Sequence, residues 1–220
     1  SSQSENPLEA TSLEQEAQRA FENALNSNAN YARARIGLGS VYFLQAQETQ
    51  PLSTLLSTSD ALIKAFDEYD LALALARQSA DKQGEILATY SVGTAYYLQG
   101  GAYRSDGQLG AADKAFRLAI NTFDAILASL QETNQQRLLG QAYQAKGAAY
   151  KELAKMWAEQ GDEQKAADLY EQARQTFESL LLLDPPPALR AQLERYLEQT
   201  RHGQPLAPVF SGYLVANLGK

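Results

Sequence analysis

A long-period pattern of apolar and polar positions runs through the 220 residues of this chain. The segment Gly39–Gln45, which begins Gly-Ser-Val-Tyr, recurs as Gly93–Gln99 and more weakly as Gly147–Leu153. The glycines that open the three copies give a constant period of 54, and so do the tyrosines within them. Self-similarity at a fixed period is typical of repeat architectures. We therefore expect the chain to be built from repeated structural units.

An aromatic residue among small residues marks a second pattern, which alternates with the first. Alanines lie four positions before and three positions after Phe21, Phe116 and Tyr170, whereas the copy at Phe66 has larger residues there. Spacings of three and four put side chains on one stripe of a helix. Small residues beside a ring allow a neighbouring helix to approach closely. The two patterns therefore predict two kinds of helix in alternation.

Capping residues and helix breakers predict where these helices begin and end. Ser12 and Gln15 can form a capping box, Asp60 and Asp81 are candidate caps, and a loop rich in Pro, Ser and Thr covers residues 48–59. The expected helices are 12–26, 30–47, one from Asp60, one from Asp81 to Gly100-Gly101, one after Gly107–Gly110, one opened by Thr133 or Asn134, one from Gly161-Asp162 to the prolines after Asp184, and 188–200.

Together the two patterns resemble the tetratricopeptide repeat. The best match consists of Ala17, Phe21 and Ala24 followed by Gly39 and Tyr42, with the family's spacing from Phe to Gly. The period of 54 exceeds the family's usual value of about 34.

In the later copies the interval from glycine to aromatic residue, Gly93 to Phe116 and Gly147 to Tyr170, exceeds the family consensus by seven. Seven residues are close to two helical turns at about 3.6 residues per turn. We therefore expect unusually long helices with ordinary pairing.

The resemblance implies an all-α fold, an antiparallel helix-pair solenoid of about eight helices with a C-terminal capping helix. The expected organisation is a flexible N-terminal arm at 1–11, the helical repeat domain at 12–202 and an apolar C-terminal tail at 203–220. The first helix resembles the second member of a repeat whose first member is missing. Tyr42, Tyr96 and Tyr150 match the buried position of the family, which predicts a core role for them.

A different set of side chains faces a concave groove if the resemblance holds. The matching places of the carboxylate clamp found in chaperone-binding members carry uncharged residues here, so an apolar peptide or helix suits the groove better. The alternative is that the extra helical length buries these rings. The expected groove residues are Arg33, Ile36, Ser40, Phe43, Leu44, Leu87, Tyr90, Thr94, Tyr97, Leu98, Gln141, Gln144, Ala148, Lys151 and Glu152.

The composition of the chain argues against several classes of function. The formal net charge of −7 disfavours nucleic acids and anionic membrane surfaces as partners. The longest apolar run, Leu71–Ala76, is far below the roughly 20 residues of a membrane-spanning helix. The chain has no cysteine and one histidine, His202, which excludes thiolate nucleophiles, cysteine-bound metals and paired histidines. We expect no catalytic residue, no metal and no cofactor.

The two ends of the chain have opposite characters. The polar, Ser-rich start suits a bacterial lipoprotein whose anchoring segment was removed, and a cloning boundary explains it equally well; we expect an extracytoplasmic location. From Gly203 to Gly219 the tail has no charge and seven large apolar side chains. Such a segment does not stay solvated alone. We expect it to pack on its own helices, with docking on another subunit or a partner as the alternative.

These observations favour a protein–protein interaction scaffold that presents its groove to a peptide or helix of an assembly partner. The alternative is a binding protein for a small apolar ligand, extracytoplasmic and associated with a transporter. Groove aromatics fit both hypotheses. Neither hypothesis requires an enzyme.

Overall fold

The computed structural model of the chain describes residues 7–48 and 60–201. Within these ranges the backbone is helical apart from short turns, and no strand occurs in them. The fold is therefore all-α, which confirms the prediction. Residues 1–6 of the expected arm, residues 49–59 of the expected loop, His202 and the tail at 203–220 lie outside the described residues.

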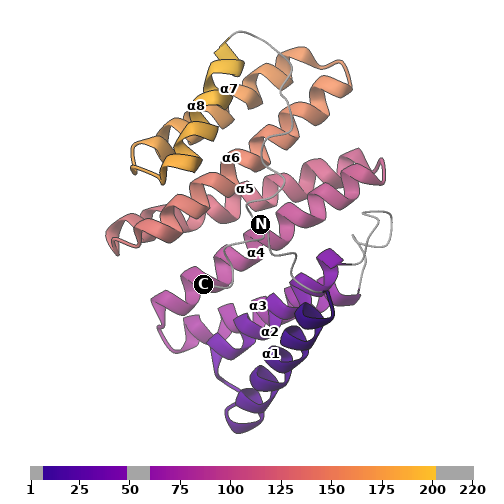
Figure 1. Cartoon of the computed structure of the whole chain (residues 1–220), viewed down its shortest axis with the longest axis vertical. Helices are drawn as coiled ribbons and strands as arrows, with labels where there is room; N and C mark the ends of the chain where they lie inside the picture. The colour runs from indigo at the N-terminus through magenta and orange to yellow at the C-terminus, as the bar shows by residue number, and fades with distance from the viewer. Residues whose placement is uncertain (1–6, 49–59, 202–220) are drawn as a thin grey trace. The chain divides into compact units, whose positions relative to one another are not determined.

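Eight helices make up the described residues, and Figure 1 labels them in chain order. Their bounds are α1 Pro7–Ser27, α2 Ala32–Glu48, α3 Asp60–Gln78, α4 Lys82–Ser105, α5 Leu109–Glu132, α6 Gln136–Glu159, α7 Glu163–Leu181 and α8 Pro187–Arg201. The helix α1 begins ahead of the expected capping box at Ser12. The longest helices, α4 to α6, have 24 residues each, as the lengthened period predicts.

The chain divides into two compact units, and the boundary lies inside α4, between Ala95 and Tyr96. The first unit contains α1 to α3 and the start of α4; α1 packs on α2, and α2 packs on α3. In the second unit α5 packs on α6, α6 on α7 and α7 on α8. Because only short turns join most of these helices, consecutive helices run antiparallel within each unit.

From α4 to α7 the period of the sequence is also the period of the backbone, whereas α2 and α3 begin at shorter spacings from α4 and α5. The spacing from the start of α4 at Lys82 to the start of α6 at Gln136 equals that between the repeated glycines, and α5 and α7 begin at the same spacing. The turns follow the same rule. Gly107 and Gly161 both have positive φ, +74° and +80°, and terminate α4 and α6. A glycine is suited to this left-handed position at the end of a helix because it has no Cβ.

Aspartates cap the starts of α4 and α7, and the first of these caps, Asp81, confirms the prediction. Asp81 accepts a hydrogen bond from the backbone N–H of Gly84 at 2.9 Å, and Asp162 accepts one from Lys165 at 3.1 Å. Each bond satisfies one of the unpaired donors in a first helical turn. The expected cap of α6 is wrong, because Gln135 precedes that helix and makes no side-chain cap. Asn134 instead takes a left-handed φ of 52° in the turn.

Pairs of a glycine and an aromatic ring hold the long helices together. A Cβ added to Gly39 of α2 would lie 2.6 Å from the ring of Tyr69 of α3, and one added to Gly147 of α6 would collide with the ring of Phe177 of α7. The interval along the chain from glycine to aromatic residue is the same in both pairs. Both rings are buried, with exposed fractions of 2% and 0%. The two units therefore contain the same helix-pair register.

The lengthened interval from glycine to aromatic residue, taken from the sequence, is not the one that the structure pairs. Gly147 packs against Phe177, seven residues beyond Tyr170. Phe116 packs against Gly100 instead, whose added Cβ would lie 2.7 Å from the ring. Since Gly100 lies seven residues beyond Gly93, its interval to Phe116 is that of the family. This contact also explains why α4 continues through Gly100-Gly101, where the sequence predicts its end.

Candidate functional site

The expected groove residues of the first unit are mostly covered. Arg33 is exposed and donates from Nη2 to Oε1 of Gln83 at 3.0 Å. Ile36, Leu44 and Leu87 are half-buried. Ser40 faces the neighbouring helix, since its Oγ accepts a 3.4 Å hydrogen bond from the hydroxyl of Tyr69. The buried members of the set are Phe43, Tyr90 and Thr94.

Tyr90 and Thr94 have buried, hydrogen-bonded surroundings, which indicates a role in packing for both side chains. The hydroxyl of Thr94 donates to the carbonyl oxygen of Tyr90 at 3.0 Å, one turn earlier in α4. Burial raises the pKa of Tyr90 to about 12, although its hydrogen bond with Thr94 acts in the opposite direction. A neutral, buried phenol contributes packing and hydrogen bonding. Both side chains therefore belong to the core of their unit.

The expected groove residues of the second unit are divided between two places. Tyr97 and Leu98 are half-buried in the middle of α4, just past the boundary between the units. The centroid of the Tyr97 ring lies 5.7 Å from that of the Phe116 ring. Gln141 and Gln144 are half-buried and line a cleft. Farther along α6, Ala148 and Lys151 are buried and Glu152 is half-buried in a cluster of charges. The structure thus brings some of these residues together and separates others.

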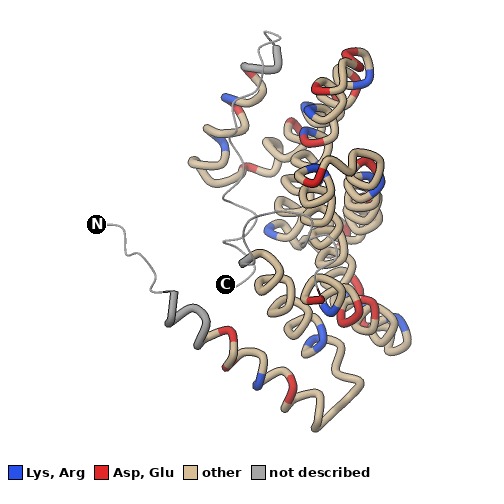
Figure 2. Tube along the Cα trace, turned by 90° about the vertical axis from the view of Figure 1, so that its right-hand side faces the viewer, with Lys and Arg blue, Asp and Glu red and all other residues tan. Residues whose placement is uncertain are grey.

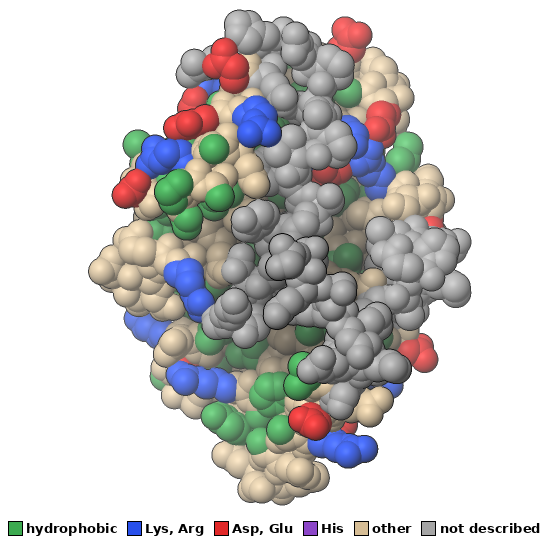
Figure 3. All heavy atoms as spheres, in the orientation of Figure 1, with side chains coloured by type: hydrophobic (Ala, Val, Ile, Leu, Met, Phe, Trp, Pro, Cys, Tyr) green, Lys and Arg blue, Asp and Glu red, His purple; other side chains and the backbone are tan. Residues whose placement is uncertain are grey.

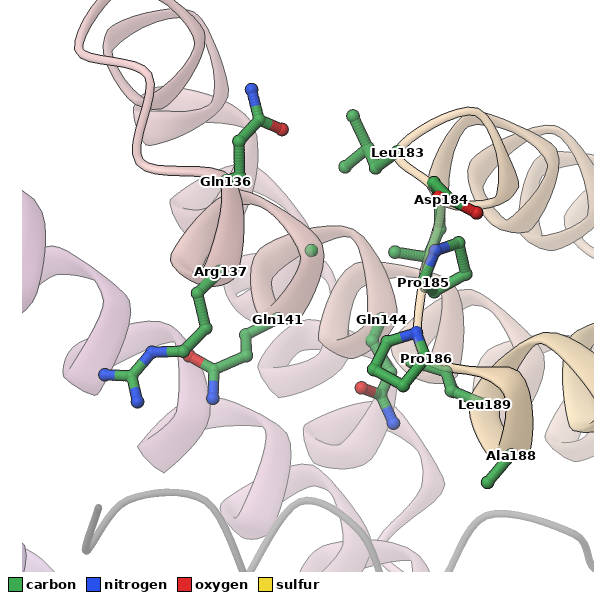
Figure 4. Close-up of a pocket in the computed structure, with 12 residues that line it drawn as sticks. Gln136, Arg137, Gln141, Gln144, Leu183, Asp184, Pro185, Pro186, Ala188 and Leu189 are labelled. Carbon is green, nitrogen blue, oxygen red and sulfur yellow. The ribbon is translucent and has the colours of Figure 1, made fainter.

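The cleft lies between the start of α6 and the connection from α7 to α8. It has a volume of about 470 Å³ and is partly open to solvent. Figure 4 shows the side chains of α6 on one side and those of the connection and of α8 on the other. The α6 wall consists of Gln136, Arg137, Gly140, Gln141 and Gln144. The opposite wall consists of Leu180, Leu183, Asp184, Pro185, Pro186, Ala188 and Leu189.

The sequence makes the second wall rigid. Three consecutive prolines cannot continue α7, and Asp184 before them adopts a left-handed φ of 52°. The carboxylate of Asp184 accepts a 2.6 Å hydrogen bond from Nη2 of Arg190, which ties the connection to the first turns of α8. A proline-rich wall held at both ends loses little conformational freedom when a ligand binds.

An apolar cluster beneath the cleft fixes α8 on α7. Phe177, Leu180, Leu193 and Tyr196 are buried together, and Leu189 packs against them. The rings of Phe177 and Tyr196 meet edge to face, with their centroids 4.9 Å apart. Edge-to-face pairs contribute about 0.5–1.5 kcal/mol beyond the burial of their area. The cleft is therefore formed by packed elements and exists without a ligand.

A cluster of charges occupies the other half of α6. Arg104 of α4 makes ion pairs with Glu152 at 2.5 Å and with Glu159 at 2.6 Å. The ammonium group of Lys151 lies 3.8 Å from the carboxylate of Glu152. Burial lowers the pKa of Lys151, and the neighbouring Glu152 opposes that change. The side chains of this cluster balance one another locally.

Tyrosine rings surround the charge cluster and stay protonated. Burial, with a contribution from Glu152, raises the pKa of Tyr97 above its ordinary value of 10.0. The pKa of Tyr170 rises for the same two reasons, burial first. Phenols with such values remain neutral over the physiological range of pH. They offer hydrogen bonds and apolar surface there, and no general base.

A second set of contacts is centred on the single tryptophan and was not predicted from the sequence. Nε1 of Trp157 donates to Oδ1 of Asp113 at 3.0 Å, which links α6 to α5. The ammonium of Lys165 lies 3.1 Å from the centre of the same ring and adds α7. Burial opposes ionisation of Asp113, yet hydrogen bonds from Arg117 and Trp157 lower its pKa. No repeat spacing indicates this contact, because the tryptophan occurs once.

The tyrosines expected in the core are less buried than the family pattern implies. Tyr42, Tyr96 and Tyr150 are all half-buried. Tyr150 packs with its ring against the apolar cluster formed by Phe116, Leu153 and their neighbours in the second unit. The fully buried rings are instead Phe43, Tyr69, Phe116, Phe123, Phe177 and Tyr196. Three of these, Tyr69, Phe123 and Phe177, follow the same period as the glycines, a signal that the sequence contains.

Charge and apolar surface are finely divided on the described helices. Figure 2 shows acidic and basic residues interspersed along the trace. On the face drawn in Figure 3, hydrophobic side chains are visible in small separate groups with charged side chains between them. No helix among those described is both long and apolar enough to cross a membrane. In the same residues no group of three or more His, Asp or Glu side chains is placed to hold a metal ion.

The chain has no match among protein-family models and none among curated proteins.

Proposed function

We propose that this chain is a protein-interaction scaffold that receives an apolar segment of an assembly partner on the α6 face of its second unit. The observation that carries the proposal is the cleft with two unlike walls. Gln136, Gln141 and Gln144 supply amide donors and acceptors, which can hydrogen-bond a peptide backbone. The leucines and prolines of the opposite wall supply apolar contact for side chains. This combination is typical of peptide recognition.

We also propose that the chain is a tetratricopeptide-repeat protein with elongated helices. The repeated register supports this assignment, because Gly39 with Tyr69 and Gly147 with Phe177 form equivalent contacts. The family interval between Gly100 and Phe116 supports it further. Proteins built from stacked helix pairs commonly act as binding surfaces. Binding instead of catalysis also accords with a sequence that has no cysteine and one histidine.

The proposal is tested by affinity capture of the full chain from the cells that produce it, followed by mass spectrometry. The cleft variant Gln141→Arg/Gln144→Arg adds two positive charges to the α6 wall, which already carries Arg137. The control variant Gln164→Arg/Gln175→Arg makes the same change at exposed positions of α7. One protein should be retained by the wild type and by the control, and be reduced at least about tenfold by the cleft variant. Equal retention by both variants would remove the cleft from the proposal.

A small apolar ligand is the second candidate, and the size of the cleft is the observation in its favour. A volume of about 470 Å³ lies within the range of about 300–1,000 Å³ that small-molecule sites have. Native mass spectrometry of the purified full chain separates the two hypotheses. A retained small molecule that the cleft variant loses would favour the ligand-binding hypothesis. A bare chain together with specific protein capture would favour the scaffold.

A further inference from the structure

The C-terminal tail matches the chemistry of the cleft. Residues 203–219 contain no charged side chain, and their apolar members include Val209, Phe210, Tyr213 and Leu214. The α6 wall of the cleft carries three glutamine amides and Arg137, the opposite wall is mostly apolar, and Asp184 on that opposite wall already pairs with Arg190. An uncharged apolar segment therefore brings no charge of its own into the cleft. The amide wall can also satisfy backbone groups that an extended segment would otherwise bury unpaired.

The chain is long enough to place the tail there. The cleft is lined by Ala188 and Leu189 at the start of α8, and α8 ends at Arg201. Twelve to thirteen helical residues span about 19 Å at about 1.5 Å per residue. An extended segment covers that distance with about six residues at about 3.3 Å each. Residues 202–207 are therefore enough for the return, and Val209 to Leu214 then reach the level of the cleft.

We propose that the C-terminal tail of the same chain occupies the cleft between α6 and the α7–α8 connection, with the segment from Val209 to Leu214 as its anchor. Attachment to α8 gives this segment an effective concentration in the millimolar range, as is typical of short flexible linkers. A second copy at micromolar concentration competes poorly with it. The tail is therefore bound within its own chain.

Tail binding has a consequence for recognition, which rests on the proposed function. A partner that uses the cleft must displace the tail, and this competition lowers its apparent affinity by the fraction of chains with an open cleft. The tail then acts as an internal competitor. It also protects the apolar walls from nonspecific contact while no partner is present.

Disulfide formation in the full chain tests the proposal, because the native sequence has no cysteine to interfere. Gln144→Cys places a thiol in the cleft, and Val209→Cys or Tyr213→Cys places one in the tail. The control replaces Gln144→Cys by Gln175→Cys, at an exposed position of α7. Under mild oxidation of dilute protein, one cleft pair should close within the chain at least about tenfold faster than its control pair, since the tethered thiols are held together.

A cleft-filling variant separates docking from mere proximity. A Cβ added to Gly140 has room, because the nearest side-chain atom, Cδ1 of Leu180, would be 3.6 Å away. Gly140→Leu should therefore narrow the cleft and reduce disulfide formation to the control rate, whereas Gly140→Ala should leave the rate near that of the parent pair. Circular dichroism verifies that each variant is folded.

Three results would overturn the proposal. The first is equal rates for both cleft pairs and their controls. The second is a predominance of covalent dimers, which would show binding between copies. The third is a rate that Gly140→Leu does not change. These measurements involve no partner, so failure of the tail proposal leaves the scaffold function standing, and failure to capture a partner leaves the tail result valid.

Discussion

At the scale of single residues, glycine acts here by the room that it leaves for an aromatic ring. Gly147 lies in the middle of α6, where helix propensity favours alanine, yet its missing Cβ is the space that the ring of Phe177 fills. Gly140 lies two turns earlier in the same helix, and a Cβ added there would make only an ordinary van der Waals contact, 3.6 Å from Cδ1 of Leu180. A comparison of substitutions at the two positions therefore distinguishes the effect of glycine on packing from its low helix propensity.

The first prediction compares the two alanine variants of α6. Gly147→Ala should reduce the free energy of unfolding by about 1–3 kcal/mol, since the added methyl group overpacks the helix pair. Gly140→Ala should leave it unchanged or raise it by up to about 1 kcal/mol through better helix propensity. Urea denaturation followed by circular dichroism measures both. A stabilising Gly147→Ala would contradict the observed packing.

The second prediction concerns Tyr69, whose pKa is raised by burial to about 12, with hydrogen bonds to Ser40 and Ser91 acting in the opposite direction. The folded state thus holds the phenolic proton more tightly than the unfolded chain, where the pKa is about 10. The resulting stability is complete below pH 10 and is lost as the pH rises toward 12. The free energy of unfolding should therefore fall across this interval.

The measurement is a set of urea denaturations between pH 9 and 12 for the wild type and for Tyr69→Phe. The phenylalanine variant keeps the ring against Gly39 and removes the titrating group, so its stability should decline less steeply. Parallel slopes for the two proteins would show that the Tyr69 hydroxyl titrates normally in the folded state.

At the scale of the helix, the capping residues were the easiest features to predict. Asp81 was predicted as a cap because a carboxylate before a helix has a local partner in the backbone three residues later, and Asp162, predicted only as part of a break between helices, makes the same bond. The end of α4 could not be assigned in this way. Gly100-Gly101 has the composition of a helix end, but a ring from another helix, Phe116, packs against Gly100 and makes continuation favourable.

The third prediction tests one of these caps. Asp162→Ala should reduce the free energy of unfolding by about 1 kcal/mol, because it leaves the N–H of Lys165 without its side-chain acceptor. Asp168→Ala removes the same group from an exposed position inside α7 and should change stability by no more than about 0.5 kcal/mol. Thermal and urea unfolding of both variants provide the measurement. Equal losses would show that charge, and not capping, is responsible.

The candidate site was only partly predictable for a related reason. Gln141 and Gln144 could be chosen from the repeat, because equivalent helix positions face the same direction in each copy. The opposite wall could not be chosen, since Leu183 to Pro186 belong to a connection that occurs once and has no counterpart in the repeat, and Ala188 and Leu189 begin the helix that follows it. Likewise, the pairing of Arg104 with Glu152 joins two residues 48 positions apart, outside the period.

At the scale of the whole molecule, one period recurs in the sequence and in part of the backbone. The starts of α4 to α7, the glycines of their turns and three of the buried rings follow it, whereas the starts of α2 and α3 do not. Local agreement of this kind is expected for repeat proteins, because each repeat makes the same kinds of contact as its equivalents along the chain. The effect of a substitution at one position can therefore be predicted from the packing at the equivalent positions of the other copies.

Gly93 tests the repeat most directly. It is buried in α4, and its equivalents Gly39 and Gly147 both lie under aromatic rings. Gly93→Ala should therefore reduce the free energy of unfolding by about 1–3 kcal/mol in urea denaturation of the full chain. Gly101→Ala, in the same helix with no atom within 4 Å of the added Cβ, should be neutral or stabilising. A Gly93→Ala variant as stable as Gly101→Ala would contradict the repeat.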